Sequence, residues 1–314
     1  MNELKKYQPE PAGLGRAPTV EFSEYFSDDL TGNYLKGKSA RELFEEKVDD
    51  FFNDWEDNVY MAGQAGVGKT YIVDETAKKY PDVKLIKIEG SMTPFFFAKQ
   101  LAVEMYMAEM SGKKRIAVYL DDINTLFHNL QMVDMFKEML KPNGLGSFSY
   151  NRGMNIKGFE DIEAEAIEYW KSKNPSKVGF EIPFNNRVRF IMTMNTGIVS
   201  SSEVALLKPG KQKSFQESLA AVRSRIEHGY VDLIMTKETM WGWISYVVWN
   251  DPTMCEGATA EQRYEILQYM WDGWEKCNER SLRFVEYTMW KVMKKHPARK
   301  DYIARWTRHF TMDV

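Results

Sequence analysis

Several features common in protein sequences are scarce or missing in this chain, and each absence excludes a class of protein. Only two cysteines are present among the 314 residues, and Cys255 and Cys277 fit neither a zinc site nor a disulfide framework. No run of about 18 apolar residues occurs, so no membrane-spanning helix is predicted. The first residues, M-N-E-L-K-K-Y-Q, lack the apolar stretch of a signal peptide, and we expect a cytoplasmic protein.

The chain also lacks a strong charge of either sign. Its 42 Lys and Arg stand against 45 Asp and Glu, so the formal net charge of −3 gives no global attraction to nucleic acid or anionic membrane. A local basic patch is not excluded. Hydrophobic residues make up 44%, and the length suits one large domain with a smaller one. The composition is compatible with a phage-encoded protein, for which the cytoplasm would be that of the host.

The two ends of the chain differ from its middle. Pro and Gly are frequent in residues 1–20, which we expect to be flexible or to become ordered on a neighbouring subunit, and we assign 1–38 to a flexible N-terminal arm. Apolar residues at three- and four-residue steps predict a helix over 39–55. From 236 to 314 the chain is predicted to be helical and rich in Trp and Met, which indicates a small all-α domain.

The middle of the chain, residues 39–235, alternates between strand and helix patterns. Strands are expected at 59–62, 83–88, 115–120 and 190–194, and helices at 70–79, 94–110 and 123–140. This alternation predicts an α/β domain with a parallel sheet covered on both faces. Residues 143–187 interrupt the pattern with glycines, among them Gly144, Gly146, Gly153 and Gly158, and a helix near 160–171, so we interpret them as an insertion.

A phosphate-binding motif follows the first strand. The sequence G-Q-A-G-V-G-K-T at 63–70 matches G-x-x-x-x-G-K-[ST], in which glycines let the backbone N–H groups surround a phosphate at a helix N-terminus. Lys69 is expected to reach the β- and γ-phosphates of ATP, and Thr70 to bind Mg²⁺. The expected nucleotide-binding residues are Gly63, Gln64, Ala65, Gly66, Val67, Gly68, Lys69, Thr70 and Tyr71.

A pair of carboxylates follows another apolar strand, in I-A-V-Y-L-D-D at 116–122. Ligands of parallel sheets bind at the carboxyl ends of the strands, so Asp121 is expected beside the phosphates as the second Mg²⁺ residue. Asp122 is placed to polarise the attacking water. Glu is the commoner residue there, and the alternative is that both Asp residues only cap the following helix.

A polar residue ends a third apolar strand. The run R-F-I-M-T-M-N-T-G stops on Asn195, a poor strand former, which would face the γ-phosphate if this strand lies beside that of Asp121. With this third motif the sequence resembles the AAA+ ATPases over residues 40–314. The resemblance identifies Asn195 with their sensor 1 and implies a three-layer αβα P-loop core followed by an α-helical lid.

The resemblance extends to two arginines. The segment S-L-A-A-V-R-S-R-I-E-H-G, residues 218–229, resembles the AAA+ helix whose arginine reaches the ATP of the neighbouring subunit. Arg225 is the favoured candidate and Arg223 the second, while surface ion pairs are the alternative. The segment S-L-R-F-V-E-Y, residues 281–287, resembles the sensor 2 helix and implies that Arg283 touches phosphates within its own subunit. The resemblance also implies a homo-oligomeric ring, commonly of six subunits.

Two further features concern the kind of AAA+ protein. Extended pieces around 185–186 suggest a hairpin just before the sensor strand, similar to the pre-sensor 1 hairpin clade of MoxR-like and dynein-related ATPases. Phe95, Phe96 and Phe97 follow the second strand, where ring motors carry a pore loop. Consecutive helical side chains point about 100° apart, so the three cannot all face one core. One hypothesis is that Phe96 or Phe97 lines a channel, and the other is that these residues pack against the lid or a neighbour.

Three functions remain open from the sequence. The first is an ATP-driven motor that remodels a protein partner, favoured by the near-neutral charge and the mixed charges of the insertion. The second is a replication-associated ATPase, such as a helicase loader or initiator, because Asp121-Asp122 and S-R-I-x-x-G resemble those proteins as well; no helix-turn-helix or basic arm is visible to support it. The third is a nucleotide-gated scaffold without turnover, allowed by Asp at 122.

Overall fold

The structure, a computed structural model, describes residues 20–53, 58–90, 93–122, 129–151, 159–175, 178–195, 209–226, 230–233, 235–277 and 279–311. Contacts divide the chain into two compact units. The sheet unit comprises Phe44–Gln64 and Lys69–Ile234, and the helical unit comprises Met1–Leu43, Ala65–Gly68 and Met235–Val314. No helix within the described ranges is long and apolar enough to cross a membrane.

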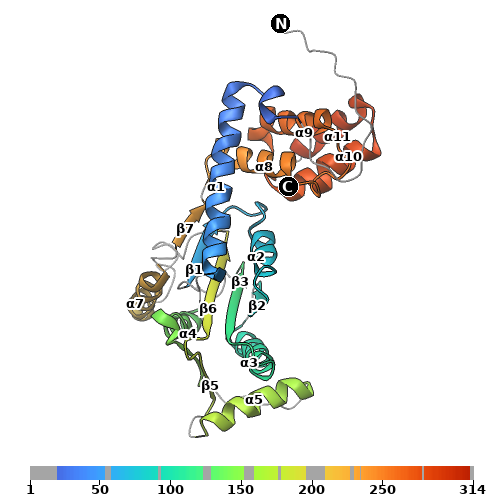
Figure 1. The fold of residues 1–314 in the computed structure, drawn as a ribbon. Coiled ribbons are helices and arrows are strands. Elements are labelled where there is room, and N and C mark those ends of the chain that lie inside the picture. Colours follow the sequence, from blue (N-terminus) through green and yellow to red (C-terminus); the bar gives the residue numbers. More distant parts are fainter. Residues whose placement is uncertain are drawn as a thin grey trace. The chain divides into compact units, whose positions relative to one another are not determined.

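Five parallel strands form the centre of the sheet unit (Figure 1). They are β1 (Val59–Gly63), β2 (Val83–Glu89), β3 (Arg115–Asp121), β6 (Val188–Met194) and β7 (Tyr230–Leu233). Their order is β2-β3-β6-β1-β7, and every neighbouring pair is parallel. The strands β1 and β6 are buried throughout, as expected for apolar runs in a sheet covered on both faces. Because the strands are parallel, their carboxyl ends share one edge.

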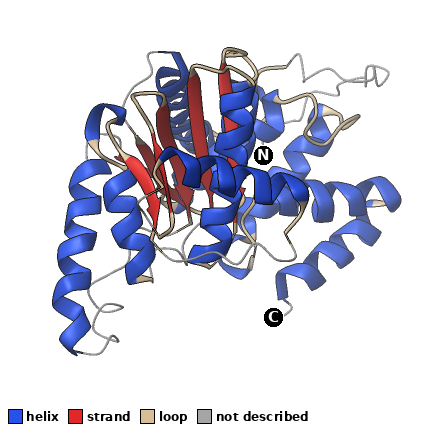
Figure 2. Cartoon of the chain, turned by 90° about the horizontal axis from the view of Figure 1, so that it is seen from below, coloured by secondary structure: helices blue, strands red, loops and turns tan. Residues whose placement is uncertain are grey.

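Helices lie on both faces of this sheet (Figures 1 and 2). On one face, α3 (Pro94–Met110), α4 (Leu130–Met139) and α7 (Pro209–Ile226) share a core with alternate strand residues such as Leu120 and Met192. On the other face lies α2 (Lys69–Ala77), where Asp74 pairs with Lys87 of β2 at 3.1 Å. The structure therefore confirms the predicted three-layer αβα core with a parallel sheet.

The insertion carries a two-stranded ribbon. It contains η3 (Pro142–Gly144), β4 (Ser147–Tyr150), α5 (Asp161–Lys173) and β5 (Phe180–Pro183). The expected hairpin, with Asn185 and Asn186 at its turn, is wrong in its strand pairing. The partner of β5 is β4, which runs antiparallel to it and precedes α5 in the sequence. Asn185 and Asn186 instead form a turn between β5 and β6 with φ of 49° and 63°, a region that Asn tolerates. Trp170 of α5 anchors the insertion by donating to the Ala102 carbonyl of α3 at 2.9 Å.

Aromatic residues fill the core of the helical unit. Its elements are η1 (Phe22–Glu24), the first part of α1 (Asp28–Asn53), α8 (Lys237–Asn250), α9 (Ala260–Asp272), η5 (Trp274–Lys276), η6 (Phe284–Trp290), α10 (Lys291–Lys295) and α11 (Arg299–Thr311). Trp241, Trp243 and Trp306 are completely buried. In residues 235–277 and 279–311 the structure has helices and no strand, which confirms the prediction of a helical C-terminal part.

The N-terminal region differs from the expectation of a flexible arm over 1–38. Residues 1–19 and 54–57 lie outside the described residues, but α1 begins at Asp28 rather than at 39. The side chains of Phe22, Phe26 and Leu30 are buried, and Phe22 stacks on Phe26 at 4.1 Å. Apolar side chains spaced four residues apart supply the buried face that an arm would lack.

Two glycines allow α1 and α8 to approach closely. A Cβ on Gly37 would lie 1.9 Å from the backbone nitrogen of Trp243, and a Cβ on Gly242 would lie 1.8 Å from the backbone oxygen of Asn33. Such distances are far inside van der Waals contact, so any side chain would push the two backbones apart. Gly32, one turn earlier in α1, has open space around it.

This packing predicts opposite effects for two glycine substitutions in one helix. Gly37→Ala should lower the free energy of unfolding by about 1–3 kcal/mol, because overpacking displaces the helices. Gly32→Ala should raise it by about 0.5–1 kcal/mol, because alanine restricts the unfolded chain and nothing obstructs its methyl group. Denaturant unfolding of both variants measures this, and equal effects would contradict the close helix contact.

Candidate functional site

The loop between β1 and α2 has the backbone of a phosphate-binding loop. Gly63 ends β1, and Lys69 begins α2. Gly66 and Gly68 have φ of 77° and 90°, conformations that side chains rarely adopt. The N–H groups at the start of α2 have no partner within the helix, so this end of the helix attracts anions. The nine expected nucleotide-binding residues occupy this loop and the first turn of α2.

The ammonium of Lys69 lies inside the sheet unit. Its side chain donates to the carbonyls of Gly63 at 2.8 Å and Gln64 at 2.7 Å, and to Asn195 Oδ1 at 3.3 Å. Burial lowers the pKa of Lys69 to about 8, although the charges of Asp121 and Asp122 oppose that shift. The positive charge is therefore held at the loop with little solvation, which favours exchange of its weak acceptors for a phosphate oxygen.

Both carboxylate oxygens of Asp121 accept hydrogen bonds. The Thr70 hydroxyl donates to Oδ2 at 2.7 Å, and the Thr193 hydroxyl donates to Oδ1 at 2.6 Å. Tyr119 places its hydroxyl 3.0 Å from that of Thr193, and burial raises the pKa of Tyr119 above its ordinary value. Thr193 was not predicted as a site residue, because a threonine within a strand is ordinary.

Asn195 joins the lysine to the second carboxylate. While its Oδ1 accepts from Lys69, its Nδ2 donates to Asp122 Oδ1 at 2.9 Å. Asp122 has φ of 53°, in the left-handed region that Asp and Asn adopt at single positions, and its N–H donates to the Thr193 carbonyl at 3.0 Å. The ends of β1, β3 and β6 thus bring Lys69, Asp122 and Asn195 together, as adjacent strand ends predicted.

Arg225 lies in the last turn of α7. It is half-buried, and its Nη1 donates to the Ala221 carbonyl at 3.4 Å. Arg223 lies in the same turn and is exposed. Among the hydrogen bonds of the described residues, none joins Arg225 to the group formed by Lys69, Asp121 and Asn195.

Residues 66 and 67 have partners within the helical unit. The Leu282 N–H donates to the Gly66 carbonyl at 2.9 Å, and Trp243 Nε1 donates to the Val67 carbonyl at 2.8 Å. A Cβ on Gly66 would lie 2.2 Å from that of Ser281, so glycine is required there. Arg283 is the next residue after Leu282 and is exposed, and η6 begins directly after it.

The three consecutive phenylalanines have different surroundings. Phe97 is fully buried against Phe136 and Phe148, so the expectation that it could line a channel is wrong. Phe95 packs partly on the same core and edge-on against Phe159. Phe96 is 54% exposed, and only this member of the three remains available to a partner.

The residues present fit a magnesium nucleotide. The Thr70 hydroxyl and Asp121 Oδ2 are hard oxygen donors 2.7 Å apart, and Mg²⁺ is commonly bound by one or two protein oxygens together with phosphates and water.

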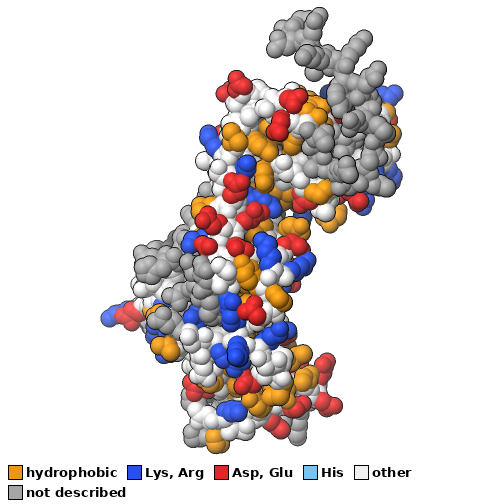
Figure 3. Space-filling view, viewed as in Figure 1, with side chains coloured by type: hydrophobic (Ala, Val, Ile, Leu, Met, Phe, Trp, Pro, Cys, Tyr) orange, Lys and Arg blue, Asp and Glu red, His pale blue; other side chains and the backbone are white. Residues whose placement is uncertain are grey.

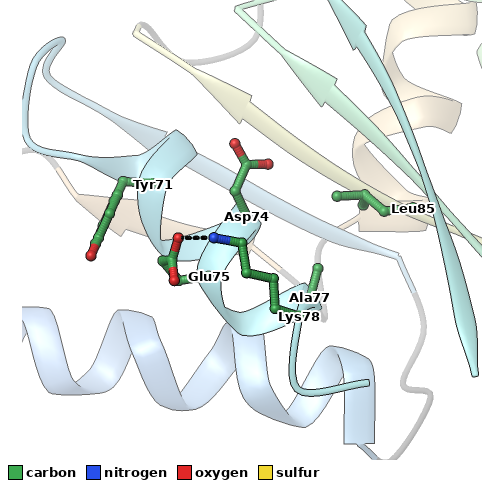
Figure 4. A pocket seen from close by; sticks show the side chains of 6 residues that line it. All are labelled: Tyr71, Asp74, Glu75, Ala77, Lys78 and Leu85. Carbon is green, nitrogen blue, oxygen red and sulfur yellow. Dashed lines mark hydrogen bonds and ion pairs between the residues drawn. The ribbon is translucent and has the colours of Figure 1, made fainter. Parts of the chain in front are cut away.

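An open hollow of about 520 Å³ lies farther along α2 (Figure 4). Its lining includes Tyr71, Leu85 and the ion pair of Lys78 with Glu75, and it does not include the phosphate loop.

Comparisons with known proteins found no matching family model and no matching curated protein. Similar solved structures include AMPPCP-bound DnaA from Aquifex aeolicus (15% identity, TM-score 0.37) and a DNA replication initiation factor (15%, 0.36). The match covers 84% and 87% of this chain, and 63% and 65% of those two chains, less than two thirds of their length. Rif2 in complex with the C-terminal domain of Rap1 is also similar (9% identity, TM-score 0.36, 90% of this chain and 85% of that one).

The lowered pKa of Lys69 predicts that nucleotide binding weakens as the pH rises above 8. Above pH 8 the free protein loses the ammonium proton, and a neutral amine attracts phosphate weakly. The Kd of a non-hydrolysable ATP analogue, measured by calorimetry, should therefore rise by up to about tenfold per pH unit above 8. Binding by Lys69→Arg should stay constant between pH 7 and 10, since a guanidinium remains charged. A constant wild-type Kd over this range would contradict the assignment.

Proposed function

We propose that this chain is an ATP hydrolase of the AAA+ type that binds and hydrolyses Mg-ATP. The observation that carries the proposal is the convergence of Lys69, Asp121, Asp122 and Asn195 where β1, β3 and β6 end. An ammonium, two carboxylates and an amide beside a left-handed glycine loop match what phosphoryl transfer requires, namely positioning and charge stabilisation.

The loop and α2 would bind the triphosphate. The ammonium of Lys69 would exchange the Gln64 carbonyl and Asn195 for β- and γ-phosphate oxygens. Thr70 and Asp121 would hold Mg²⁺, which when bound neutralises charge developing on the phosphates. Thr193 keeps one oxygen of Asp121 occupied, which leaves the oxygen near Thr70 for the metal. Arg283 would contribute a further cation to the phosphates.

Asp122 and Asn195 would position the attacking water. The Asp122 carboxylate can accept a proton from water, a role worth about 10²–10⁴ in rate. The Asn195 amide holds that carboxylate through Nδ2. Once nucleotide draws Lys69 away, the Oδ1 of Asn195 becomes available to accept a hydrogen bond from the attacking water.

Substitution of the proposed base separates binding from hydrolysis. Asp122→Asn should retain Mg-ATP affinity but lower kcat by at least about 10²-fold, because an amide cannot accept the proton. Phosphate release measures turnover, and calorimetry measures binding. Unchanged turnover would remove Asp122 from the mechanism. No turnover by the wild-type protein, with binding intact, would favour the nucleotide-gated scaffold.

We infer further that a second copy of the chain completes the site. The position of Arg225 at the end of α7 supports this, since no described hydrogen bond links it to the loop of its own chain. A guanidinium supplied by a neighbour can be worth about 10³–10⁵ in kcat. A closed homo-oligomeric ring, commonly of six subunits in the family that the sequence resembles, would supply one such arginine to every site.

Mixing two inactive variants tests completion between subunits. Lys69→Ala should lose nucleotide binding, and Arg225→Ala should lose hydrolysis while it still binds. A one-to-one mixture should regain up to about a quarter of the wild-type rate, because some interfaces pair an intact loop with an intact arginine. Arg223→Ala is the matched control and should remain active alone. No recovery on mixing, or full activity of Arg225→Ala, would contradict a shared site.

Turnover in such a ring would drive work on a macromolecular partner. A protein partner was favoured by the overall charge, and Phe96 could grip it as a channel residue. Membership of the pre-sensor 1 hairpin clade rests on the resemblance; an antiparallel pair, β4 with β5, precedes β6, although its pairing differs from the expected one. A replication-associated role acting on DNA is the second candidate, and the charge distribution of the helical unit favours it.

A further inference from the structure

The last two helices of the described chain carry a concentrated positive charge. Between residues 291 and 311 there are seven Lys and Arg and a single acidic residue, Asp301, a formal charge of +6 in a chain of net charge −3. Blue side chains are visible along the right-hand border of the helical unit in Figure 3. The basic residues are Lys291, Lys294, Lys295, Arg299, Lys300, Arg305 and Arg308, and we call this surface the basic face.

Most of this charge is exposed and not neutralised. All seven side chains are exposed, and Arg299 forms an ion pair with Glu265. The four lysines of the basic face and Arg305 form no ion pair with any residue that the structure describes. Like charges this close repel one another, and a polyanion would relieve that repulsion.

The apolar side of the same helices is already used. Tyr302, Trp306 and Phe310 of α11 are buried, and Trp306 Nε1 donates to the Met289 carbonyl of η6 at 3.0 Å. Phe284 and Phe310 pack edge to face at 5.5 Å. A helix that lies on a membrane buries its apolar face in the lipid. Here the protein core occupies that face, so an anionic membrane is disfavoured.

The spacing of the basic side chains suits a phosphate chain. Lys300, Ala304 and Arg308 lie four residues apart on the side of α11 opposite to Tyr302 and Trp306. The two cations are therefore about 12 Å apart along the helix axis. A nucleic acid strand offers a phosphate about every 3.4 Å along a duplex axis, so both cations can be engaged at once. The small Ala304 between them leaves room for the backbone to approach.

An exposed aromatic residue adjoins the basic face. Tyr287 is 69% exposed, and Lys291 and Lys295 follow it at four-residue steps along the continuous helical segment formed by η6 and α10. Exposed aromatics beside cations stack on unpaired bases, which a protein partner does not offer and a duplex conceals. Tyr287 therefore favours a single strand.

We propose that the basic face and Tyr287 form a binding surface for single-stranded nucleic acid. The cations contact the phosphates without reading the sequence, and the ring of Tyr287 stacks on a base. This surface belongs to the helical unit alone. It deepens the proposed function by naming a partner class, and the coupling of binding to ATP turnover rests on that function, whereas the binding itself does not.

Salt dependence of binding tests the role of the charges. Fluorescence anisotropy with a labelled 30-nucleotide single strand should show wild-type affinity falling steeply as salt rises, with a slope of about −0.7 per phosphate contact. The triple variant Lys294→Gln, Lys295→Gln, Lys300→Gln should bind at least about tenfold more weakly at 100 mM salt, with a slope shallower by about 2.

A matched control removes the same charge elsewhere. Lys36, Lys114 and Lys213 are exposed lysines outside the basic face. Changing all three to Gln should leave affinity and slope within about twofold of wild type. Equal losses in the two triple variants would overturn the proposal, as would wild-type protein that does not bind the strand at 50 mM salt.

The stacking role of Tyr287 has a separate signature. Tyr287→Ala should weaken binding of the single strand by about tenfold with an unchanged salt slope, since no phosphate contact is lost. Tyr287→Phe should bind as the wild type does, and a duplex of the same sequence should bind equally to all three proteins. Tighter binding of the duplex than of the single strand would overturn the assignment of the strand.

Two further arms separate this proposal from its competitors. Vesicles of anionic phosphatidylglycerol should not compete with the strand, and competition by vesicles that exceeds that by unlabelled strand would assign the face to lipid. Phosphate release is measured in the same samples. Absence of turnover with intact strand binding would remove the ATPase proposal and leave this surface standing, while loss of strand binding with normal turnover would do the reverse.

Discussion

The carboxylate of Asp121 is the contact on which the rest of the site depends. It accepts hydrogen bonds from Thr70 of α2 and from Thr193 of β6, so one side chain of β3 fixes both the start of the helix and the neighbouring strand. Tyr119 extends the network to a third hydroxyl group inside the sheet unit. A carboxylate that is held at both oxygens cannot rotate freely, and this fixed orientation is what a small cation with strict octahedral geometry demands.

An asparagine at the end of a buried strand is explained by its two neighbours. Lys69 needs an acceptor and Asp122 needs a donor, and a single amide supplies both. A carboxylate at 195 would add a third negative charge beside Asp121 and Asp122, whereas an aliphatic residue would remove one hydrogen bond from Lys69 and one from Asp122. The lowered pKa of Lys69 shows that its charge is poorly solvated in this arrangement, which makes a phosphate the better partner.

Much of the site could be predicted from the sequence, because a short motif dictates its own backbone. The glycines at 66 and 68 and the lysine at 69 determine the loop wherever a strand precedes and a helix follows. Thr193 could not be predicted, since its role depends on a side chain from another strand. The pairing of β4 with β5 was missed because α5 separates them, and the start of α1 was missed because Gly32 and Gly37 resemble helix breakers. The basic face was hidden because its cations alternate in the sequence with buried aromatics.

The central claim is that Asp121 and Thr70 hold the metal of a bound nucleotide. Electron paramagnetic resonance with Mn²⁺ in place of Mg²⁺ tests it directly, because bound and free Mn²⁺ give different signals. The account predicts one bound Mn²⁺ per chain in the presence of a non-hydrolysable ATP analogue, lost in Asp121→Asn and retained in Asp122→Asn. Equal Mn²⁺ binding by the wild type and Asp121→Asn, or none by the wild type, would contradict it.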